Sequence, residues 1–517
     1  MNNHGIGSWV WRRRERSRGD VALTYAGERV RYEELAERID RLAVALRDRG
    51  VAAGDRVAYL GNNHPSFLEA LLATTTLGAI FVPLNTRLAP PEIEYALEDS
   101  GTTTLFFHTE LTDLARSGSW STGAKRRIVI GGATPVAGVE EYEALLGSGA
   151  NEHLDAPVGL DDPAIILYTS GTTGHPKGAV LTHGNLTWNC FNALVDYGVS
   201  SGERVLLISP LFHVASLSMG ALPVLLQGGT VIIHEKFDPQ LVLETIESER
   251  VTMLAGVPTT FQLLQEHPAW ESTDISSLAH LTCGGSTMPE RMLAAYEARG
   301  LGFSRGYGMT ETAPGATAMP PRMARHKMES SGLTHFFTDV KIVDEHGNEL
   351  PQGEVGEIWV SGPNVITEYW RRPEATQQAI VNGWFRSGDL GHFDEQGYIY
   401  ISDRLKDMII SGGENIYSAE VEGIIMELTD ISAVALIGVP DDKWGEVPLA
   451  IVSLQDRSTL TSDAIVAHLT GRLAKYKIPK RVEFVDELPR TASGKVRKAD
   501  LRAQYAAESS ARQEEKS

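Results

Sequence analysis

Residues 165–178 read IILYTSGTTGHPKG, an apolar strand followed at once by a loop rich in glycine, serine and threonine. The glycines let the backbone bend so that successive N–H groups point into one concavity, which suits phosphate oxygens. Ser170, Thr172 and Thr173 add hydroxyl donors to that concavity. Lys177 adds a positive charge, but the Gly-Lys-Ser/Thr ending of a Walker A loop is missing. The stretch therefore predicts a buried strand that ends in a phosphate-binding loop of another kind.

Strand and helix signals alternate on both sides of this loop, which is typical of an α/β fold with a largely parallel sheet. Upstream, the expected elements are a helix over Tyr32–Asp48, a strand over Arg56–Leu60, a helix over Pro65–Leu77 and a strand over Ile80–Pro83. Downstream, they are a helix from Gly184, a strand over Arg204–Ile208, a helix over Leu217–Leu226, a strand over Thr230–His234 and a helix over Pro239–Glu249. The pattern predicts two α/β lobes.

Further along, the sequence changes character twice. Between about Val340 and Ile401, short strand signals separated by turn dipeptides predict a small β barrel or sandwich. From Asp403 onward the pattern is that of a compact α+β domain. Its expected elements are the strands Ala433–Val439 and Leu449–Leu454 and helices that start at Ser418 and Ser462. We therefore expect an N-terminal domain over residues 1–402 and a C-terminal domain over residues 403–517.

The composition is that of a globular protein, with 42% hydrophobic and 22% charged residues in a chain of 517. That length corresponds to roughly three to four domain-sized units. The net charge of −20 argues against nucleic acid or an anionic membrane surface as a partner. Cys190 and Cys283 are too few for a disulfide framework or a CxxC metal site, so we expect a reducing, cytoplasmic environment.

No segment predicts a membrane span. The uncharged stretch Val214–Ile233 contains Pro223 and three glycines, which divide it into a helix and a strand. An arginine cluster near the N-terminus is not followed by the apolar region that an export signal requires. We expect a helix end exposed to solvent there, with the arginines Arg12, Arg13, Arg14, Arg16 and Arg18.

The phosphate loop closely resembles that of the acyl-adenylating superfamily, which includes acyl-CoA synthetases, peptide-synthetase adenylation domains and firefly-type luciferases. Four further motifs of that superfamily follow in the same order: Gly306–Glu311 (GYGMTE), Arg386–Asp389 (RSGD), Asp403–Asp407 (DRLKD) and Pro489–Lys495 (PRTASGK). With Ser411–Asn415 (SGGEN), the closest likeness is to bacterial fatty-acyl-CoA ligases. The resemblance covers nearly the whole chain, and five motifs in this order are not expected by chance.

The resemblance implies a reaction in two steps. A carboxylate attacks the α-phosphate of ATP and expels pyrophosphate, and the acyl group then passes from acyl-AMP to the thiol of coenzyme A. Because pyrophosphate concentrates negative charge, metal and cation clamps should dominate catalysis. The implied ATP contacts in and beside the phosphate loop are Thr169, Ser170, Gly171, Thr172, Thr173, Gly174 and Lys177.

The next motif is implied to hold the metal ion and the adenine. Glu311 is a hard oxygen ligand that suits Mg²⁺, and the resemblance places that ion between phosphates. Thr310 is implied to contact a phosphate oxygen. Tyr307 offers a flat face to adenine, and the turn with Gly285 and Ser286 is expected opposite it.

The remaining implied site residues serve the ribose, the α-phosphate and the thiol. Asp389 is a carboxylate acceptor that can take both ribose hydroxyls, with Arg404 beside it. Lys495 resembles the lysine that bridges the substrate carboxylate and the α-phosphate during adenylation. His213 is implied to be the gate between the acyl pocket and the pantetheine tunnel, and Gly413 to line that tunnel.

One active site must present Lys495 in the first step and a thiol tunnel in the second. A single arrangement of the C-terminal domain cannot satisfy both demands, so we expect that domain to be mobile. The resemblance places the hinge at Lys406, within Asp403–Asp407.

The segments expected around the acyl group are apolar and small, namely Phe212–Met219, Leu254–Thr260, Cys283–Ser286 and the stretch after Tyr307. Val214, Ala215 and Ser216 follow His213, without the aspartate that pairs an α-amino group in peptide-synthetase domains. A hydrophobic carboxylic acid is therefore the expected substrate. The segment Ser331–Phe337 replaces a Gly-Arg-Pro-like turn of relatives, which leaves straight, aryl and polycyclic acids open.

Three alternatives to an acyl-CoA synthetase stay open at this point. An adenylase that loads the phosphopantetheine of an acyl carrier protein would use the same tunnel, and only the acceptor distinguishes it. A luciferase-like oxygenase would emit light rather than end at a CoA thioester. A binding protein without catalysis is disfavoured by the presence of Lys177, Glu311 and Lys495. A monomer and a homodimer are equally compatible with the sequence.

Overall fold

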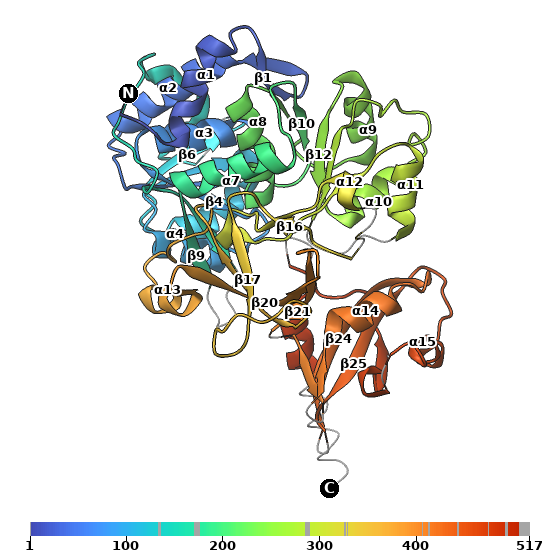
Figure 1. Cartoon of the computed structure of the whole chain (residues 1–517). Helices are drawn as coiled ribbons and strands as arrows, with labels where there is room; N and C mark the ends of the chain where they lie inside the picture. Colours follow the sequence, from blue (N-terminus) through green and yellow to red (C-terminus); the bar gives the residue numbers. More distant parts are fainter. Residues whose placement is uncertain are drawn as a thin grey trace. The chain divides into compact units, whose positions relative to one another are not determined.

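The computed structural model describes residues 2–132, 136–169, 176–284, 290–324, 327, 329–405, 407–411, 414–441, 444–473, 475–491 and 495–505. The chain divides into two compact units (Figure 1). The first contains Met1–Val340 and Val360–Phe385, and the second contains Lys341–Trp359 and Arg386–Ser517. The predicted domain division between residues 402 and 403 stays a prediction.

The first unit contains two seven-stranded sheets. In the first of them β3 is central, β4 and β5 flank it, and only β9 is antiparallel to its neighbour. The order is β7 (Val139–Glu141), β6 (Arg126–Ile130), β5 (Thr104–His108), β3 (Arg56–Leu60), β4 (Ile80–Leu84), β8 (Pro163–Thr169) and β9 (Lys177–Thr182). The phosphate-loop strand is thus the last parallel strand of this sheet.

The second sheet repeats the arrangement around β10, and only β2 is antiparallel to its neighbour. The order is β14 (Phe303–Ser304), β13 (His280–Cys283), β12 (Met253–Gly256), β10 (Arg204–Leu207), β11 (Thr230–Ile233), β1 (Val21–Tyr25) and β2 (Glu28–Arg31). Buried side chains from its strands and helices form one core, including Leu206, Leu254, Phe261, Tyr296 and Phe303. The two predicted α/β lobes are confirmed.

Helices cover these sheets (Figure 1). They are α1 (Trp9–Arg16), α2 (Tyr32–Asp48), α3 (Pro65–Thr76), α4 (Pro90–Ser100), α5 (Thr112–Ser119), α6 (Tyr142–Ser148), α7 (His183–Asp196), α8 (Leu222–Gln227), α9 (Pro239–Ser248), α10 (Pro258–Glu266) and α11 (Glu290–Ala298). Local caps explain several starts: Thr182 accepts from the Asn185 N–H at α7, and Asp238 accepts from the Leu241 N–H at α9. The predicted helix over Leu217–Leu226 is instead a π-helical turn, Ser216–Ala221, that leads into α8.

Short elements complete the first unit, and a third sheet follows. The short elements are α12 (Pro321–Ala324), β15 (Thr317–Ala318), β16 (Leu333–Thr334) and α13 (Pro373–Ala379). The third sheet has the order β17 (Asp339–Val343), β18 (Gly356–Ser361), β20 (Trp384–Phe393) and β19 (Ile380–Val381), with β21 (Ile399–Arg404) paired to β20. This sheet occupies the region in which the sequence predicted a small barrel or sandwich.

The second unit ends in an α+β fold, as predicted. Its sheet has the order β23 (Glu414–Ile416), β22 (Ile409–Ser411), β25 (Gly445–Leu454) and β24 (Ile431–Asp441), with β26 (Arg481–Phe484) paired to β25. The helices α14 (Ser418–Ile425) and α15 (Ser462–Leu469) start where the sequence predicted. Their buried faces pack on the sheet through residues such as Val421, Ile425 and Ile465.

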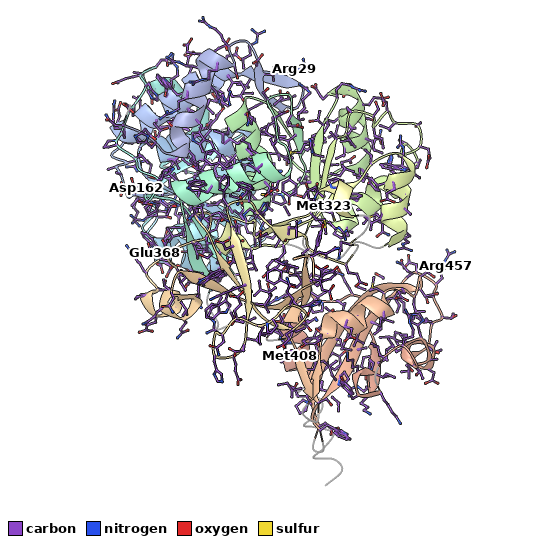
Figure 2. The ribbon with its side chains drawn as sticks, in the orientation of Figure 1. Arg29, Asp162, Met323, Glu368, Met408 and Arg457 are labelled. Atoms are coloured by element: carbon purple, nitrogen blue, oxygen red, sulfur yellow. The ribbon has the colours of Figure 1, made fainter. Side chains whose placement is uncertain are left out.

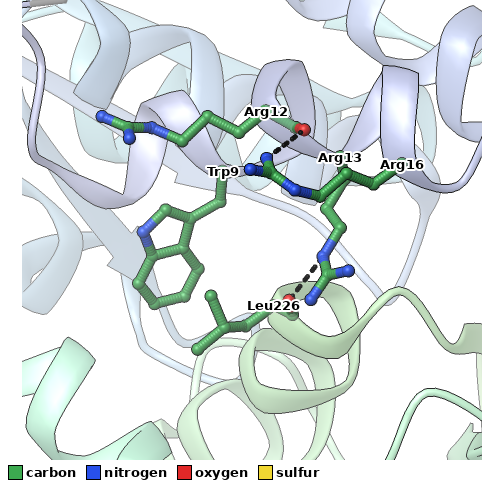
Figure 3. A pocket seen from close by; sticks show the side chains of 5 residues that line it. All are labelled: Trp9, Arg12, Arg13, Arg16 and Leu226. Carbon is green, nitrogen blue, oxygen red and sulfur yellow. Dashed lines mark hydrogen bonds between the residues drawn. The ribbon is translucent and has the colours of Figure 1, made fainter.

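The N-terminal arginines mark a helix end, as expected, and they also bind backbone carbonyls. Arg13 Nε donates to the Leu226 carbonyl at 2.6 Å, and Arg16 Nη1 donates to the Arg12 carbonyl at 3.1 Å (Figure 3). With Trp9 these residues line a cavity of about 160 Å³. Basic side chains at the carboxyl ends of helices complement the partial negative charge there, which gives α1 and α8 a structural reason for this cluster. None of the helices in the described ranges has the length and hydropathy that a membrane crossing requires.

Two histidines, the buried His183 and the half-buried His64, are expected to make the stability of the first unit dependent on pH. The Ile6 N–H donates to Nδ1 of His183 at 3.1 Å, and the Ser66 N–H donates to Nδ1 of His64 at 3.1 Å. Burial lowers the pKa of each to about 4, against a small opposing effect of Asp162 on His183 and a further lowering of His64 by its neighbour His108. Both rings are therefore neutral acceptors in the folded protein.

We expect the free energy of unfolding to fall as the pH drops from about 6.5 towards 4, because the unfolded chain binds these protons first. A shift of this size is worth about 3 kcal/mol per histidine at the acid end. Urea unfolding at a series of pH values measures the effect. A His183→Gln variant should show a shallower dependence, and an unchanged slope in this variant would assign the effect to other groups.

Candidate active site

Several predicted site residues follow neighbouring parallel strands of the second sheet. His213 lies beyond β10, Gly284 follows β13 and Tyr307 lies beyond β14. Because the carboxyl ends of parallel strands meet at one edge of a sheet, these residues share that edge, where α/β folds place their ligands. Gly285 and Ser286 lie outside the described residues. The His213 ring packs beside Phe212, with 4.7 Å between ring centroids.

Glu311 lies at the tip of a tight hairpin-like loop whose two arms pair with each other. Arg305 pairs with Met319, and Gly308 pairs with Gly315. A Cβ on Gly308 would lie 1.6 Å from the Pro314 carbonyl oxygen, so only glycine allows this approach. Glu311 occupies the short 3₁₀ turn Thr310–Thr312 between the two arms. The loop therefore presents Thr310 and Glu311 together.

The Glu311 carboxylate lies in the loop after β14 of the second sheet and contacts residues on and beside the first sheet. Thr169, the last residue of β8, donates from Oγ1 to Glu311 Oε1 at 3.3 Å. The Tyr369 hydroxyl donates to the same oxygen at 2.9 Å. The Ile366 N–H donates to the Glu311 backbone carbonyl at 2.9 Å. The predicted pair Thr169 and Glu311 thus meets in space, with a tyrosine that the motifs did not single out.

A single carboxylate fits a magnesium ion that is shared with a nucleotide. Mg²⁺ usually binds one or two carboxylates, substrate phosphates and water rather than a cage of protein ligands. In the described ranges no group of three or more His, Cys, Asp or Glu side chains could hold a metal ion. Glu311, with hydroxyl groups next to it, matches that shared mode, and its role in metal binding stays a prediction.

The two ends of the phosphate loop are fixed by strand pairing. Thr169 on β8 and Lys177 on β9 are directly opposite each other. The loop residues Ser170, Gly171, Thr172, Thr173 and Gly174 lie outside the described residues. The Lys177 ammonium lies 5.6 Å from the centroid of the Tyr369 ring. Lys177, Thr169 and Glu311 are therefore close together, since Tyr369 contacts both Lys177 and Glu311.

The segment that carries Tyr369 runs along the edge strand β9. The Val180 N–H donates to the carbonyl of Glu368, which Figure 2 labels, at 3.2 Å, and the Trp370 N–H donates to the Gly178 carbonyl at 2.7 Å. A Cβ on Gly178 would approach the Ile166 side chain to 2.7 Å and Trp370 Cβ to 3.3 Å. Glycine at this position lets the segment pack closely against β9.

Helix α7 carries a row of polar side chains at the spacing i, i+4, i+7 and i+11, which places them on one face; the first three are buried and the last is half-buried. Asn185 Nδ2 donates to the Val365 carbonyl at 2.8 Å. Asn189 Nδ2 donates to the Ser218 carbonyl at 2.9 Å, and Asn189 Oδ1 accepts from the Gly315 N–H at 3.1 Å. The helix thus holds the π-helical turn and the arm of the loop that bears Glu311.

The same face continues toward the end of α7. Asn192 Oδ1 accepts from the Phe337 N–H at 2.9 Å. Asp196 accepts from His335 Nδ1 at 2.6 Å and from the Phe336 N–H at 3.1 Å. The segment Ser331–Phe337, which the sequence analysis expects to replace a turn of relatives, is therefore anchored by its backbone and by one buried histidine. The helix predicted from Gly184 is thus confirmed, but the motifs did not single out its polar face, although the polar residues at helical spacing were a usable signal.

The second unit holds the residues predicted for ribose and the α-phosphate. Asp389 on β20 and Arg404 on β21 are directly opposite each other across the strand pair. Lys495 closes a short loop: its N–H donates to Thr491 Oγ1 at 3.2 Å, and the Thr491 N–H donates to its carbonyl at 2.7 Å. Lys406 and Gly413 lie outside the described residues, so their roles stay predictions.

A buried polar cluster connects the start of the hinge motif to the end of the chain. Asp403 accepts from the Ser418 hydroxyl at 2.8 Å, and Lys498 donates to the same hydroxyl at 2.6 Å. Lys498 also pairs with Glu422 at 2.8 Å, and burial raises the pKa of Glu422. Asp403 is thus fixed to the same body that carries the Lys495 loop.

Known proteins resemble this chain over almost its full length. A feruloyl-CoA synthase of an Amycolatopsis species is 49% identical over 505 residues, covering 98% of this chain and 100% of that protein. An indoleacetate–CoA ligase of Aromatoleum aromaticum is 41% identical over 96% of this chain and 97% of that protein. The long-chain-fatty-acid–CoA ligase FadD13 of Mycobacterium tuberculosis is 38% identical, covering 94% of each.

Solved structures agree with these relatives. ATP-bound MatB from Rhodopseudomonas palustris has a TM-score of 0.87 and is 31% identical, covering 98% of this chain and 99% of that one. The anthranilate CoA ligase AuaEII, in complex with anthranoyl-AMP, has a TM-score of 0.91 and is 26% identical, covering 99% of each chain.

Family assignment follows from two matches. The model of the AMP-binding enzyme family matches residues 10–370, and that of the AMP-binding enzyme C-terminal domain matches residues 420–495. Together they confirm the superfamily that the motifs predicted. The chain belongs to the AMP-binding enzyme family, as one of the acid–CoA ligases that use ATP, Mg²⁺ and coenzyme A.

Proposed function

We propose that this protein joins an aromatic carboxylic acid to coenzyme A through an acyl-adenylate. The observation that carries the proposal is the 49% identity, over essentially the whole chain, to a feruloyl-CoA synthase. The named substrates of the indoleacetate–CoA and anthranilate–CoA ligases are also aromatic acids. This narrows the hydrophobic acid expected from the sequence to the aryl class.

The lining expected for the acid supports an uncharged ring. Residues 210–227 contain no Asp, Glu, Lys or Arg. Within them Leu217 and Ala221 are buried, and Met219 Sδ accepts from Asn189 Nδ2 at 3.3 Å. A second charge on the substrate, such as an α-ammonium group, would find no partner in this stretch.

In the proposed mechanism, this chain's residues position charges. Mg²⁺ supplies the Lewis acidity that stabilises the phosphates as pyrophosphate leaves. Glu311 and Thr310 would hold that ion and a phosphate oxygen, and the phosphate loop with Lys177 would hold the departing phosphates. Asp389 and Arg404 would hold the ribose. Lys495 would hold the acid's carboxylate against the α-phosphate, so that attack occurs between oriented groups.

The test is pyrophosphate release over a panel of acids, with detection of the thioester by mass. The panel contains a hydroxycinnamic acid, an arylacetic acid, a benzoic acid, a medium-chain and a long-chain fatty acid, and an α-amino acid. We expect the highest kcat/KM with an aryl acid and no turnover of the amino acid. Higher kcat/KM with a fatty acid would reject the aryl class and leave the ligase assignment intact.

The acceptor is tested in the same assay. The relatives named above are CoA ligases, and none of them supports the carrier-protein alternative. We expect thioester with coenzyme A and none with a phosphopantetheinylated carrier protein. The reverse result would reject coenzyme A as the acceptor.

A further inference from the structure

Tyr369 contacts two charged side chains of the first unit, Glu311 and Lys177, to which the proposed mechanism assigns roles in adenylation. Its side chain is buried, with 8% of its surface exposed. Its hydroxyl donates to Glu311 Oε1 at 2.9 Å. Its ring centroid lies 5.6 Å from the Lys177 ammonium, within the range of a cation–π contact. One side chain therefore links the carboxylate proposed for Mg²⁺ and the lysine proposed for the phosphates.

The backbone around Tyr369 gives the ring little freedom. Its N–H donates to Thr376 Oγ1 at 2.9 Å, and the Arg372 N–H donates to its carbonyl at 3.1 Å. Tyr369 also pairs with Ala179 as an added rung on β9. The ring is thus attached to the strand that begins with Lys177.

The Tyr369 hydroxyl is a hydrogen-bond donor to the Glu311 carboxylate. A phenol has an ordinary pKa of about 10, so the Tyr369 hydroxyl carries its proton at neutral pH and donates it in the hydrogen bond to Glu311. Thr169 donates to the same Glu311 oxygen at 3.3 Å. The single Thr169 proton has a second acceptor in the Lys177 carbonyl at 3.4 Å, so the shorter hydrogen bond from Tyr369 is the main restraint on the rotation of the carboxylate about its last bond. Partners of this kind set the orientation of metal-binding carboxylates.

We propose that Tyr369 is a positioning residue for adenylation, whose hydroxyl orients the Glu311 carboxylate and whose ring face holds the Lys177 ammonium. The proposal rests on the proposed function, because it takes Glu311 as the Mg²⁺ ligand. It assigns two separable roles to one residue, and two substitutions separate them. Tyr369→Phe removes the hydroxyl and keeps the ring, whereas Tyr369→Leu removes both.

The primary measurement is calorimetric titration of ATP at a series of Mg²⁺ concentrations. We expect Tyr369→Phe to raise the Mg²⁺ concentration at half-saturation by about 10- to 100-fold. ATP binding in EDTA should be unchanged by Tyr369→Phe and weakened about threefold or more by Tyr369→Leu, because only the latter removes the face under Lys177. The rate of thioester formation from supplied acyl-AMP and coenzyme A should stay normal in Tyr369→Phe, which shows that the variant is folded.

Tyr142→Phe is the matched control. Tyr142 is a buried tyrosine of the same unit whose hydroxyl donates to the Glu69 carboxylate, which is paired with Arg38 rather than with a substrate. Its loss should lower the melting temperature without moving the Mg²⁺ dependence. Mg²⁺ dependence in Tyr369→Phe equal to that of the control overturns the proposal.

Glu311→Gln separates this proposal from the proposed function. If Glu311→Gln loses Mg²⁺-dependent ATP binding while Tyr369→Phe retains it, the role of Tyr369 is wrong and the function stands. If Glu311→Gln binds Mg²⁺ and ATP like the native protein, Glu311 is not the metal ligand. The metal role of Glu311 in the proposed mechanism and the positioning role of Tyr369 then both fail.

Discussion

Lys495→Ala is expected to slow acyl-adenylate formation by about 10²- to 10³-fold, a loss of about 3–4 kcal/mol of transition-state stabilisation. The lysine would place a positive charge between two anions that must approach each other, and no neutral group can replace it. The measurement is acid-dependent pyrophosphate release. In the second half-reaction, acyl-AMP supplied from outside should still yield the CoA thioester at a near-native rate.

Lys480→Ala is the control for this experiment, since Lys480 is another exposed lysine of the second unit and has no proposed role. The two hydrogen bonds between Thr491 and the backbone of residue 495 remain possible in Lys495→Ala, because they do not use the lysine side chain. Near-native pyrophosphate release in Lys495→Ala would remove Lys495 from the adenylation step.

Lys406→Pro is expected to leave acyl-AMP formation near its native rate and to slow thioester formation by orders of magnitude. A hinge residue must adopt two backbone conformations, and proline fixes φ near −65°. Lys406→Ala removes the charge and keeps the freedom of φ, so it should support both steps. Separate assays of pyrophosphate release and of thioester formation distinguish the two variants.

Gly413→Leu checks the same mechanism independently. A side chain there should block the pantetheine tunnel without affecting ATP, so this variant should also form acyl-AMP and fail at the thioester. If Lys406→Pro and Gly413→Leu both make thioester normally, the two-arrangement mechanism is wrong for this protein. If both lose adenylation instead, these positions serve folding or ATP binding.

Local signals predicted the fold where caps, prolines and apolar runs decide it. Helices α2, α3, α14 and α15 begin at the predicted residues, Tyr32, Pro65, Ser418 and Ser462. The π-helical turn Ser216–Ala221 was missed, because its uncharged sequence fits an ordinary helix equally well. The pairing of Val21–Tyr25 with Thr230–Ile233 could not be predicted either, since paired residues such as Leu23 and Val231 are 208 positions apart (231 − 23).

The residues of the candidate site likewise include some that the sequence predicted and some that it did not. Motif residues such as Thr169, Lys177 and Glu311 were predictable, because their chemistry requires those residue types at fixed spacing. Tyr369 was not, since its partners lie far away in sequence and a tyrosine beside a tryptophan is compatible with an ordinary core. The amides of α7 were missed for a related reason: most of their partners are backbone atoms, so the polar spacing of the helix does not indicate which segments it holds.

The hydrogen bonds of α7 determine which parts of this fold can change in sequence. Asn185 and Asn189 bind backbone carbonyls, which every residue has, and Asn189 and Asn192 bind backbone N–H groups, which every residue except proline has. The loops that they bind can therefore change much of their sequence and keep these hydrogen bonds. Helix α7 is therefore a constant support that binds the backbone of loops whose sequence can vary. Directed evolution of the acid preference should draw its libraries from residues 331–337 and leave the three asparagines untouched.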